Sequence, residues 1–339
     1  MNWRSHNKSC CSDKGRVNYI DRLIIKSASQ VAKLATCLIG AGLFLSGDAD
    51  SQNLNSEISL SQLDFKIAQV AADISVKILD LDFLGSGFIV QKSDAQSAQK
   101  YTVLTNQHVL RAGEAPYSIK TPDGKTYLAE IVSELTDDNH SYDLAILEFS
   151  ASQTYSTAKI GNSLFLSVGE PIFAAGFPFR QTTTATTSDL TLSSLDNISQ
   201  RLSVKEGRIA IILSQALEEG YQIGYTNDVE KGMSGGPLIN SQGEVVGING
   251  KHAYPLWESP EIYQDGSHPC PALQDLIIRS SLAIPIEKSI ELKPQLKFSS
   301  SDSDIASIPN VDWLSEDYQV VNQMQAEARE TMNKCKNEN

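Results

Sequence analysis

Short apolar runs alternate with turn signals through most of the middle of the chain. Runs of four to seven residues that are rich in Val, Ile, Phe or Tyr are typical of β-strands. Turn-favouring stretches such as Pro122-Asp123-Gly124 and Gly161-Asn162 separate these runs. Between about residue 67 and residue 255 we find no helical periodicity of useful length, so the pattern predicts an all-β sandwich or barrel. The clearest runs lie at residues 85–90, 101–105, 144–149, 171–176, 207–212 and 244–248.

The C-terminal part of the chain has a different pattern. Around residues 272–290 it predicts a short helix or irregular segment, followed by a closing strand at about 282–286. The serine-rich stretch at 299–304 is typical of a linker. From about Val311 a Glu-, Gln- and Lys-rich stretch with scattered apolar residues predicts a terminal helix, and roughly 25 residues are too few for an independent domain.

The N-terminal part is typical of an export signal. Residues 1–33 carry seven basic and two acidic side chains, and the uncharged apolar run 34–46 follows them. That run has the length of a signal-peptide core and is shorter than the roughly 20 residues that span a bilayer. Gly47-Asp48-Ala49 then places small residues where a signal peptidase reads. We therefore expect residues 1–49 to direct export to the periplasm or the exterior, with an uncleaved N-terminal membrane anchor as the alternative.

Charge and cysteine content narrow the function classes. The net charge is −13, and beyond residue 33 it is −18, which argues against nucleic acid or an anionic membrane as the main partner. Cys10, Cys11 and Cys37 would leave with the leader, so Cys270 and Cys335 would remain as a disulfide or as two free thiols. Because the sequence has no CxxC motif and no Cys/His cluster, we expect no metal site and no cofactor.

A serine between glycines stands at Gly232-Met233-Ser234-Gly235-Gly236-Pro237. It satisfies both the G-x-S-x-G elbow of α/β-hydrolases and the G-x-S-G-G-P loop of double-barrel serine peptidases. An elbow follows a buried apolar strand and opens a helix. Here the preceding residues 225–231 are too polar for such a strand, and residues 238–246 predict a strand, a turn and a second strand. The flanking sequence therefore favours the peptidase loop over a lipase or esterase.

The order of possible catalytic residues supports the same interpretation. His108 follows the apolar strand at 101–105, and Asp143 opens the apolar run 144–147. A carboxylate beside buried positions costs several kcal/mol unless it is paired, and a histidine Nδ1–H is a suitable partner. We therefore predict His108, Asp143 and Ser234 as a catalytic group, in the chain order of a barrel peptidase. The other histidines are expected at the surface or at a cleft rim: His140, His252 and His268.

Three motifs resemble those of a known family. Thr105-Asn106-Gln107-His108, Tyr142-Asp143-Leu144-Ala145 and the loop around Ser234 are similar to the catalytic motifs of chymotrypsin-fold serine peptidases. The residues of these motifs are most similar to those of bacterial members of the HtrA-type and glutamyl-endopeptidase branches. Gly85-Ser86-Gly87 and Gly247-Ile248-Asn249-Gly250 also match, and the resemblance covers roughly residues 67–290.

The resemblance implies a fold, a mechanism and a domain organisation. The fold would be two antiparallel six-stranded β-barrels with a short helical tail, and the substrate would be a polypeptide. Ser234 would attack a peptide carbonyl, His108 would transfer the proton, and Asp143 would hold the histidine. The N–H groups of Gly232 and Ser234 would form the oxyanion hole. The organisation would be a leader at 1–49, a polar spacer at 50–66, a peptidase domain at 67–292, and a linker with a helical tail at 293–339.

The sequence also departs from the family's patterns. Met233 stands where digestive peptidases carry the Asp that receives a new N-terminus, and no Ile-Val-Gly-Gly occurs, so activation by that route is not expected. About 50 residues follow the peptidase segment, fewer than a PDZ domain needs. A catalytically silent homologue that acts as a binding protein is the alternative to an active enzyme.

Three residues are candidates for a substrate pocket: Asp228, Asn249 and Gly250. Asp228 lies six residues before Ser234, where trypsin-like members place the carboxylate that binds Lys or Arg at P1. Asn249 falls where Glu-specific members have a pocket-wall histidine. We predict a preference for basic P1 side chains, and a solvated loop charge at Asp228 is the alternative.

Overall fold

The computed structural model describes residues 63–94, 98–136, 140–179, 201–254, 260–296 and 318–338. The predicted leader at 1–49, which contains His6, and the linker at 299–304 lie outside these residues. No helix within the described ranges is both long and apolar enough to cross a membrane.

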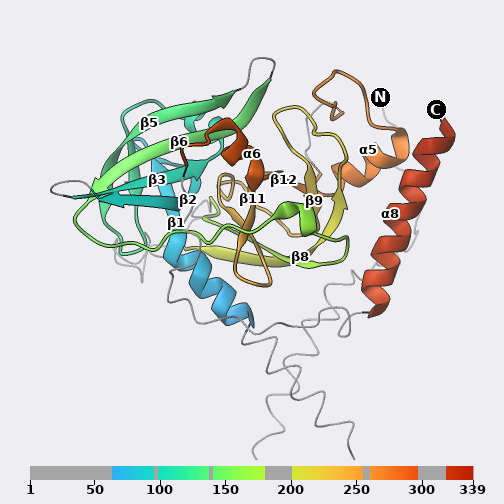
Figure 1. The fold of residues 1–339 in the computed structure, drawn as a ribbon, viewed down its shortest axis with the longest axis horizontal. Coiled ribbons are helices and arrows are strands. Elements are labelled where there is room, and N and C mark those ends of the chain that lie inside the picture. The colour runs from blue at the N-terminus through green and yellow to red at the C-terminus, as the bar shows by residue number, and fades with distance from the viewer. Residues whose placement is uncertain are drawn as a thin grey trace, which may run out of the picture. The chain divides into compact units, whose positions relative to one another are not determined.

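The first half of the described chain forms a closed antiparallel barrel with the strand order β1-β2-β3-β6-β5-β4 (Figure 1). Its strands are β1 (Ser75–Leu79), β2 (Phe83–Asp94), β3 (Gln99–Thr105), β4 (Tyr117–Lys120), β5 (Thr126–Thr136) and β6 (Ser141–Ala151). Closure leaves no strand edge unpaired, and the inward-facing residues Val76, Val103 and Leu147 fill the interior. The short helix α3 (Gln107–Arg111) follows β3 directly.

The second barrel is also closed and antiparallel, with the strand order β10-β11-β12-β9-β8-β7. Its strands are β7 (Pro171–Gly176), β8 (Ser203–Ile212), β9 (Ile223–Tyr225), β10 (Pro237–Asn240), β11 (Val245–Lys251) and β12 (Ser281–Pro285). The short 3₁₀ helix η2 (Ser163–Phe165) lies between the barrels in the chain. The predicted fold of two antiparallel six-stranded β-barrels is confirmed.

A shared hydrophobic cluster joins the two barrels. It contains Phe88 and Leu144 from the first barrel and Phe173 and Ile239 from the second, all at most 2% exposed. Because the side chains at this seam are as deeply buried as those in either barrel interior, the two barrels form one packed unit. Loops that meet at the seam are therefore held in fixed positions relative to each other.

One secondary-structure expectation near the start of the first barrel was wrong. Residues 63–74 form a helix immediately before β1, although we expected a polar spacer up to residue 66 and no helix beyond residue 67. Its buried side chains follow a helical spacing of three and four residues: Leu63, Ile67, Val70, Ala71 and Ile74. They pack in the inter-barrel cluster, so the stripe is stabilised by tertiary contacts that the local sequence does not reveal.

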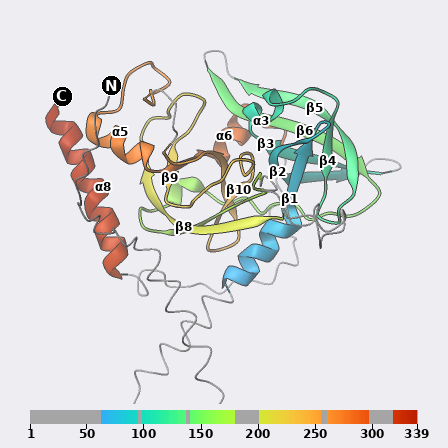
Figure 2. The same ribbon diagram turned by 180° about the vertical axis from the view of Figure 1, so that it is seen from behind.

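The C-terminal elements agree with the sequence pattern. The predicted short helix and closing strand are α5 (Pro271–Ile278) and β12, and α6 (Ile286–Leu292) follows them. The predicted terminal helix is α8 (Tyr318–Glu338), which lies alongside α5 in both views (Figures 1 and 2). A disulfide joins Cys270 to Cys335, and Arg279 forms a 2.8 Å ion pair with Glu327. The helical tail is therefore attached to the second barrel both covalently and by charge.

Candidate active site

His108 and Asp143 are brought together by the first barrel. The Nδ1 atom of His108 lies 2.6 Å from Oδ2 of Asp143, and its backbone N–H donates to Oδ1 at 2.7 Å. The His108 side chain is 42% exposed, whereas that of Asp143 is only 1% exposed. This pair therefore has a buried carboxylate and a partly exposed imidazole.

The surroundings of Asp143 favour its ionised form. Burial would raise the pKa of this carboxyl, but the hydrogen bond and charge of His108 and a hydrogen bond from the Tyr221 hydroxyl lower it below its ordinary value. The Nδ2 group of Asn106 also donates to the Asp143 carbonyl at 2.7 Å, which fixes the backbone there. A carboxylate held in this way orients the histidine and stabilises its protonated form.

Ser234 belongs to the loop between β9 and β10. Its Oγ donates to the carbonyl oxygen of Gly250 at 3.0 Å, and within the described residues no hydrogen bond joins it to His108. Hydrogen bonds of catalytic groups are often absent before substrate binds, and a serine hydroxyl changes its partner by rotating about χ1. The loop brings the serine to the seam, because its carbonyl accepts a 3.0 Å hydrogen bond from Ser86 N–H of β2.

The glycines around Ser234 stand where a larger side chain would clash or would strain the backbone. Gly232 has φ +94° and Gly235 has φ +82°, a region that side chains rarely tolerate. A Cβ on Gly232 would lie 2.6 Å from the Phe177 carbonyl oxygen, and one on Gly235 would collide with Thr105 Oγ1 and the backbone of β2. Within the described part of the chain, the N–H groups of Gly232 and Ser234 make no hydrogen bond, so both donors are available to an anionic oxygen.

Met233 lies between the two donors and is fully buried. Its side chain packs in the core of the second barrel, and Glu230 N–H points at its Sδ from 3.5 Å. A thioether cannot pair with a charged N-terminus. The loop is instead positioned by apolar packing.

The three predicted pocket residues have different surroundings. Asp228 is exposed on the loop after β9. The Asn249 side chain is fully buried, and it contacts the Ala175 and Pro237 carbonyls and the Tyr225 hydroxyl at 3.0–3.1 Å. Its amide therefore joins strands of the second barrel, whereas the carbonyl of Gly250 directly contacts Ser234.

Two residues of the site were not singled out by the sequence analysis. Ser86 donates from its hydroxyl to the Gly232 carbonyl, and its position in Gly85-Ser86-Gly87 offered a sequence signal. Tyr221 donates to Asp143 from the other barrel, and no motif marks it. Of the remaining histidines, His252 and His268 are exposed as expected, and His140 is partly exposed.

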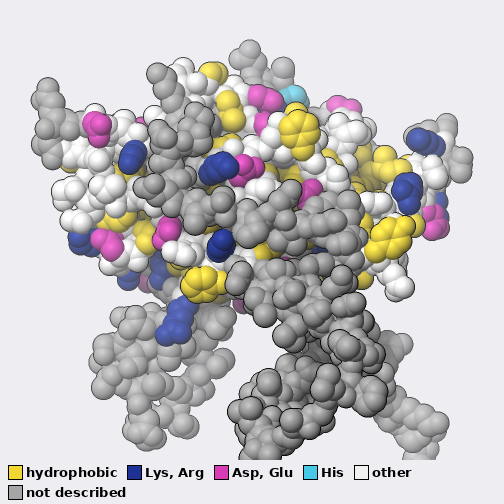
Figure 3. All heavy atoms as spheres, turned by 60° about the horizontal axis from the view of Figure 1, so that its bottom comes forward, with side chains coloured by type: hydrophobic (Ala, Val, Ile, Leu, Met, Phe, Trp, Pro, Cys, Tyr) yellow, Lys and Arg dark blue, Asp and Glu magenta, His cyan; other side chains and the backbone are white. Residues whose placement is uncertain are grey.

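Charged and apolar side chains are mixed on the face shown in Figure 3, where basic and acidic groups are interspersed.

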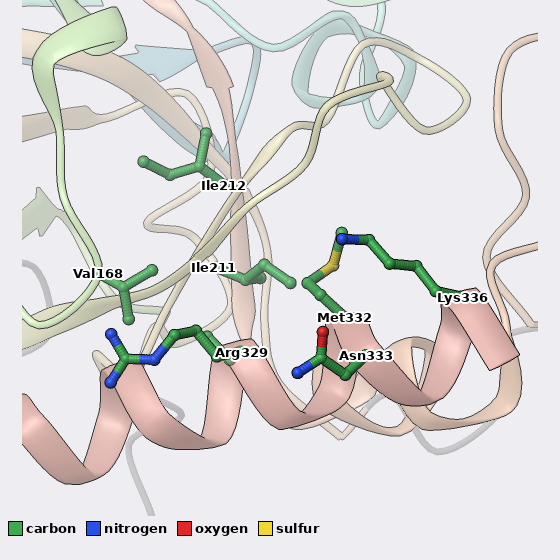
Figure 4. A pocket seen from close by; sticks show the side chains of 8 residues that line it. Val168, Ile211, Ile212, Arg329, Met332, Asn333 and Lys336 are labelled. Carbon is green, nitrogen blue, oxygen red and sulfur yellow. The ribbon is translucent and has the colours of Figure 1, made fainter.

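A separate groove of about 340 Å³ lies between α8 and β8. Arg329, Met332 and Lys336 of α8 line it opposite Ile211 and Ile212, as Figure 4 shows. The groove contains none of the predicted site residues.

Residues 85–248 match the family model of the trypsin-like peptidase domain. The matched segment begins in β2, ends in β11 and contains His108, Asp143 and Ser234. The chain contains a trypsin-like peptidase domain. The two closed barrels agree with this assignment, since the domain's fold is chymotrypsin-like.

The chain is also similar to curated HtrA serine proteases. The chain is 30% identical over 166 residues to serine protease Do-like HtrA of Bacillus subtilis and 32% identical over 165 residues to serine protease HTRA1 of Xenopus laevis. It is 31% identical over 166 residues to the mitochondrial serine protease HTRA2 of Drosophila ananassae. Each match covers 49% of this chain and 30–33% of the relative. The chain therefore spans about a third of the length of these relatives.

Proposed function

We propose that this trypsin-like peptidase domain is a serine endopeptidase that uses Ser234 as nucleophile, His108 as general base and acid, and Asp143 as the orienting carboxylate. The observation that carries the proposal is the 2.6 Å contact between His108 Nδ1 and the buried Asp143. With Asp143 ionised, Nδ1 would carry its proton toward the carboxylate, and Nε2 would be the atom that accepts a proton.

In the proposed reaction, the Ser234 hydroxyl leaves the Gly250 carbonyl and turns to His108 Nε2. As Oγ attacks the scissile carbonyl carbon, the proton passes to Nε2, and Asp143 stabilises the resulting imidazolium. The carbonyl oxygen becomes an oxyanion, for which Gly232 N–H and Ser234 N–H are the available donors. Collapse breaks the C–N bond, and the imidazolium returns its proton to the leaving amine.

The acyl-enzyme is then hydrolysed by the same groups. Water gives a proton to His108 Nε2 as its oxygen attacks the ester carbon, and the second tetrahedral intermediate expels Ser234 Oγ, which recovers the proton. The proton of Ser234 thus leaves with the amine product, and a proton from water replaces it at the end of the cycle. The residues named here carry out both half-reactions without a cofactor.

A basic P1 residue is the substrate feature that we propose. Its support is the position of Asp228, an exposed carboxylate six residues before Ser234 on the loop that leads to this serine, since an ionised carboxylate attracts a Lys or Arg side chain. We also propose that residues 1–49 direct export, on the basis of their basic head and apolar run. N-terminal sequencing of the mature protein tests export, and a new N-terminus close to residue 50 is the expected result.

Fluorophosphonate labelling tests the catalytic proposal, because only an activated serine reacts. The full chain is expected to be labelled and to hydrolyse peptides, whereas Ser234→Ala is expected to lose the label and at least about 10⁴-fold of the hydrolysis rate. Ser214→Ala is the matched control, since Ser214 is an exposed loop serine of the same barrel. A folded wild-type chain that takes no label and hydrolyses no peptide would instead be a silent, binding homologue.

A further inference from the structure

Asp143 has a second side-chain donor, which comes from the other barrel. The hydroxyl of Tyr221 donates to Oδ2 of Asp143, the same oxygen that contacts His108 Nδ1. Tyr221 precedes β9 in the second barrel, whereas His108 and Asp143 belong to the first. The tyrosine is fully buried, and only its hydroxyl reaches the carboxylate across the seam.

Gly250 lies next to the Tyr221 hydroxyl, and its lack of a side chain leaves room for this contact. A Cβ on Gly250 would lie well inside van der Waals contact of the Tyr221 hydroxyl oxygen and within 2.6 Å of its ring carbon Cζ. Gly250 has no positive φ that would require glycine. Its lack of a side chain is therefore explained by the space that the tyrosine hydroxyl occupies, and the pair Tyr221–Gly250 forms one steric unit beside Asp143.

Charged side chains from both barrels surround Tyr221 and Asp143. Glu219 lies near the charges of Asp143, His108 and Arg111 from the first barrel and of Lys251 from the second, and its carboxylate is 3.9 Å from the Arg111 guanidinium. Lys251 Nζ lies 4.8 Å from the centre of the Tyr221 ring and pairs with Glu261 at 2.9 Å. Burial, followed by the nearby Asp143 charge, raises the pKa of Tyr221 well above its ordinary value, so its hydroxyl stays protonated and can only donate to the carboxylate.

We propose that Tyr221 is a positioning residue for the proposed catalytic pair, in which its hydroxyl holds the Asp143 carboxylate and sets how strongly that carboxylate attracts His108. This inference rests on the proposed function, because it concerns the same histidine and aspartate. Since the donor comes from the second barrel, the His108–Asp143 pair reaches its working geometry only when the two barrels are correctly docked. Gly250 contributes by leaving room for the hydroxyl.

Removal of the hydroxyl has a defined electrostatic consequence. Without the Tyr221 donor, more negative charge remains on Asp143 Oδ2, which then binds an imidazolium more strongly. The His108 ring therefore stays protonated to a higher pH, and the acidic limb of the kcat/KM profile moves upward. The carboxylate also loses one of its fixed contacts, which lowers the share of correctly oriented histidine and reduces kcat.

The test uses Tyr221→Phe in the full chain, since this change removes only the oxygen atom. The proton NMR resonance of His108 Nδ1–H, assigned by its loss in His108→Ala, is expected to shift, and its pH midpoint to rise by about half a unit. We expect kcat to fall about tenfold with KM changed less than about twofold. Gly250→Ala keeps the tyrosine but displaces its hydroxyl, so it should move the same resonance in the same direction.

Tyr101→Phe is the matched control. Tyr101 is equally buried, and its hydroxyl donates to the Gln153 carbonyl at 2.9 Å in the first barrel, away from Asp143. It should change stability but not the His108 resonance or the pH profile. A Tyr221→Phe protein with the wild-type resonance, midpoint and kcat would overturn the proposal. Because the resonance is read without substrate, a chain that hydrolyses no peptide would refute the proposed function and leave this test intact.

Discussion

The Ser86 hydroxyl of the first barrel donates a 2.7 Å hydrogen bond to the Gly232 carbonyl oxygen of the second. The same hydroxyl oxygen accepts from Phe177 N–H at 2.8 Å, and Ser86 N–H donates to the Ser234 carbonyl at 3.0 Å. One buried serine thus fixes both residues whose N–H groups we propose as oxyanion donors. The orientation of these donors depends on contact between the barrels.

Ser86→Ala is expected to lower kcat/KM by about tenfold or more, because the Gly232 N–H loses its fixed direction. The buried Gly232 carbonyl and Phe177 N–H would lose their partner, at a cost of about 1–3 kcal/mol in unfolding free energy. Steady-state kinetics and urea unfolding measure the two effects. Ser289→Ala is the control, since its fully buried hydroxyl donates to the Ile286 carbonyl at 2.7 Å. Equal losses of activity in both variants would contradict an orienting role for Ser86.

Asp143→Asn should lower kcat by about 10⁴-fold, because an amide no longer favours the required histidine tautomer. The folded chain lowers the pKa of Asp143, so its charge stabilises the fold fully above its unfolded value of about 3.9. That contribution is lost as the pH falls through the folded value. The stability difference between wild type and variant should therefore be large at pH 7 and shrink at acidic pH.

Urea unfolding at several pH values checks this prediction. Asp94→Asn serves as the control, because Asp94 is exposed at the end of β2 and should show little difference at any pH. A stability gap for Asp143→Asn that stays constant down to strongly acidic pH would mean that the carboxylate's charge is not the source of the effect.

Asp228→Asn tests the proposed P1 preference. With fluorogenic peptides that differ only at P1, the wild type is expected to cleave after Lys or Arg with the highest kcat/KM. The variant should lose about 10²-fold for these peptides and less than about twofold for a Leu peptide, since only the charge pairing is removed. Asp275→Asn, an exposed change on α5, should leave the ranking unchanged. A wild-type preference for acidic P1 would refute this part of the proposal.

The helix at residues 63–74 should be part of the folded unit, which we propose begins near residue 63 rather than at 67. Ile67→Ala is expected to cost about 2–5 kcal/mol in unfolding free energy, because Ile67 is fully buried in the inter-barrel cluster. Phe65→Ala, two residues earlier and 71% exposed, should change it by less than about 0.5 kcal/mol. Thermal and urea unfolding would show whether the two substitutions differ, and equal small effects would mean that the helix does not stabilise the barrels.

Much of the architecture could be predicted from local patterns. Strands such as β3 and β6 appear as short apolar runs, and the turns between strands carry their own residue preferences. The helix at 63–74 was missed because its apolar stripe is short and is stabilised only by the seam between the barrels. The polar strand β5, whose exposed residues include Leu128 and Ile131, was missed because its side chains mostly face solvent.

The sequence by itself determined which residues we propose as the catalytic group and their chain order, His108, Asp143 and Ser234, since this proposal depends on residue type and on neighbouring apolar runs. The glycines around Ser234 were also readable, because steric limits on backbone angles act locally. Only the tertiary structure decided which groups hold these residues. Ser86 meets Gly232, and Tyr221 meets Asp143, because two closed barrels dock along one buried seam. The first contact joins residues that are 146 positions apart in the chain, and the second joins residues that are 78 positions apart. No local sequence pattern carries that information.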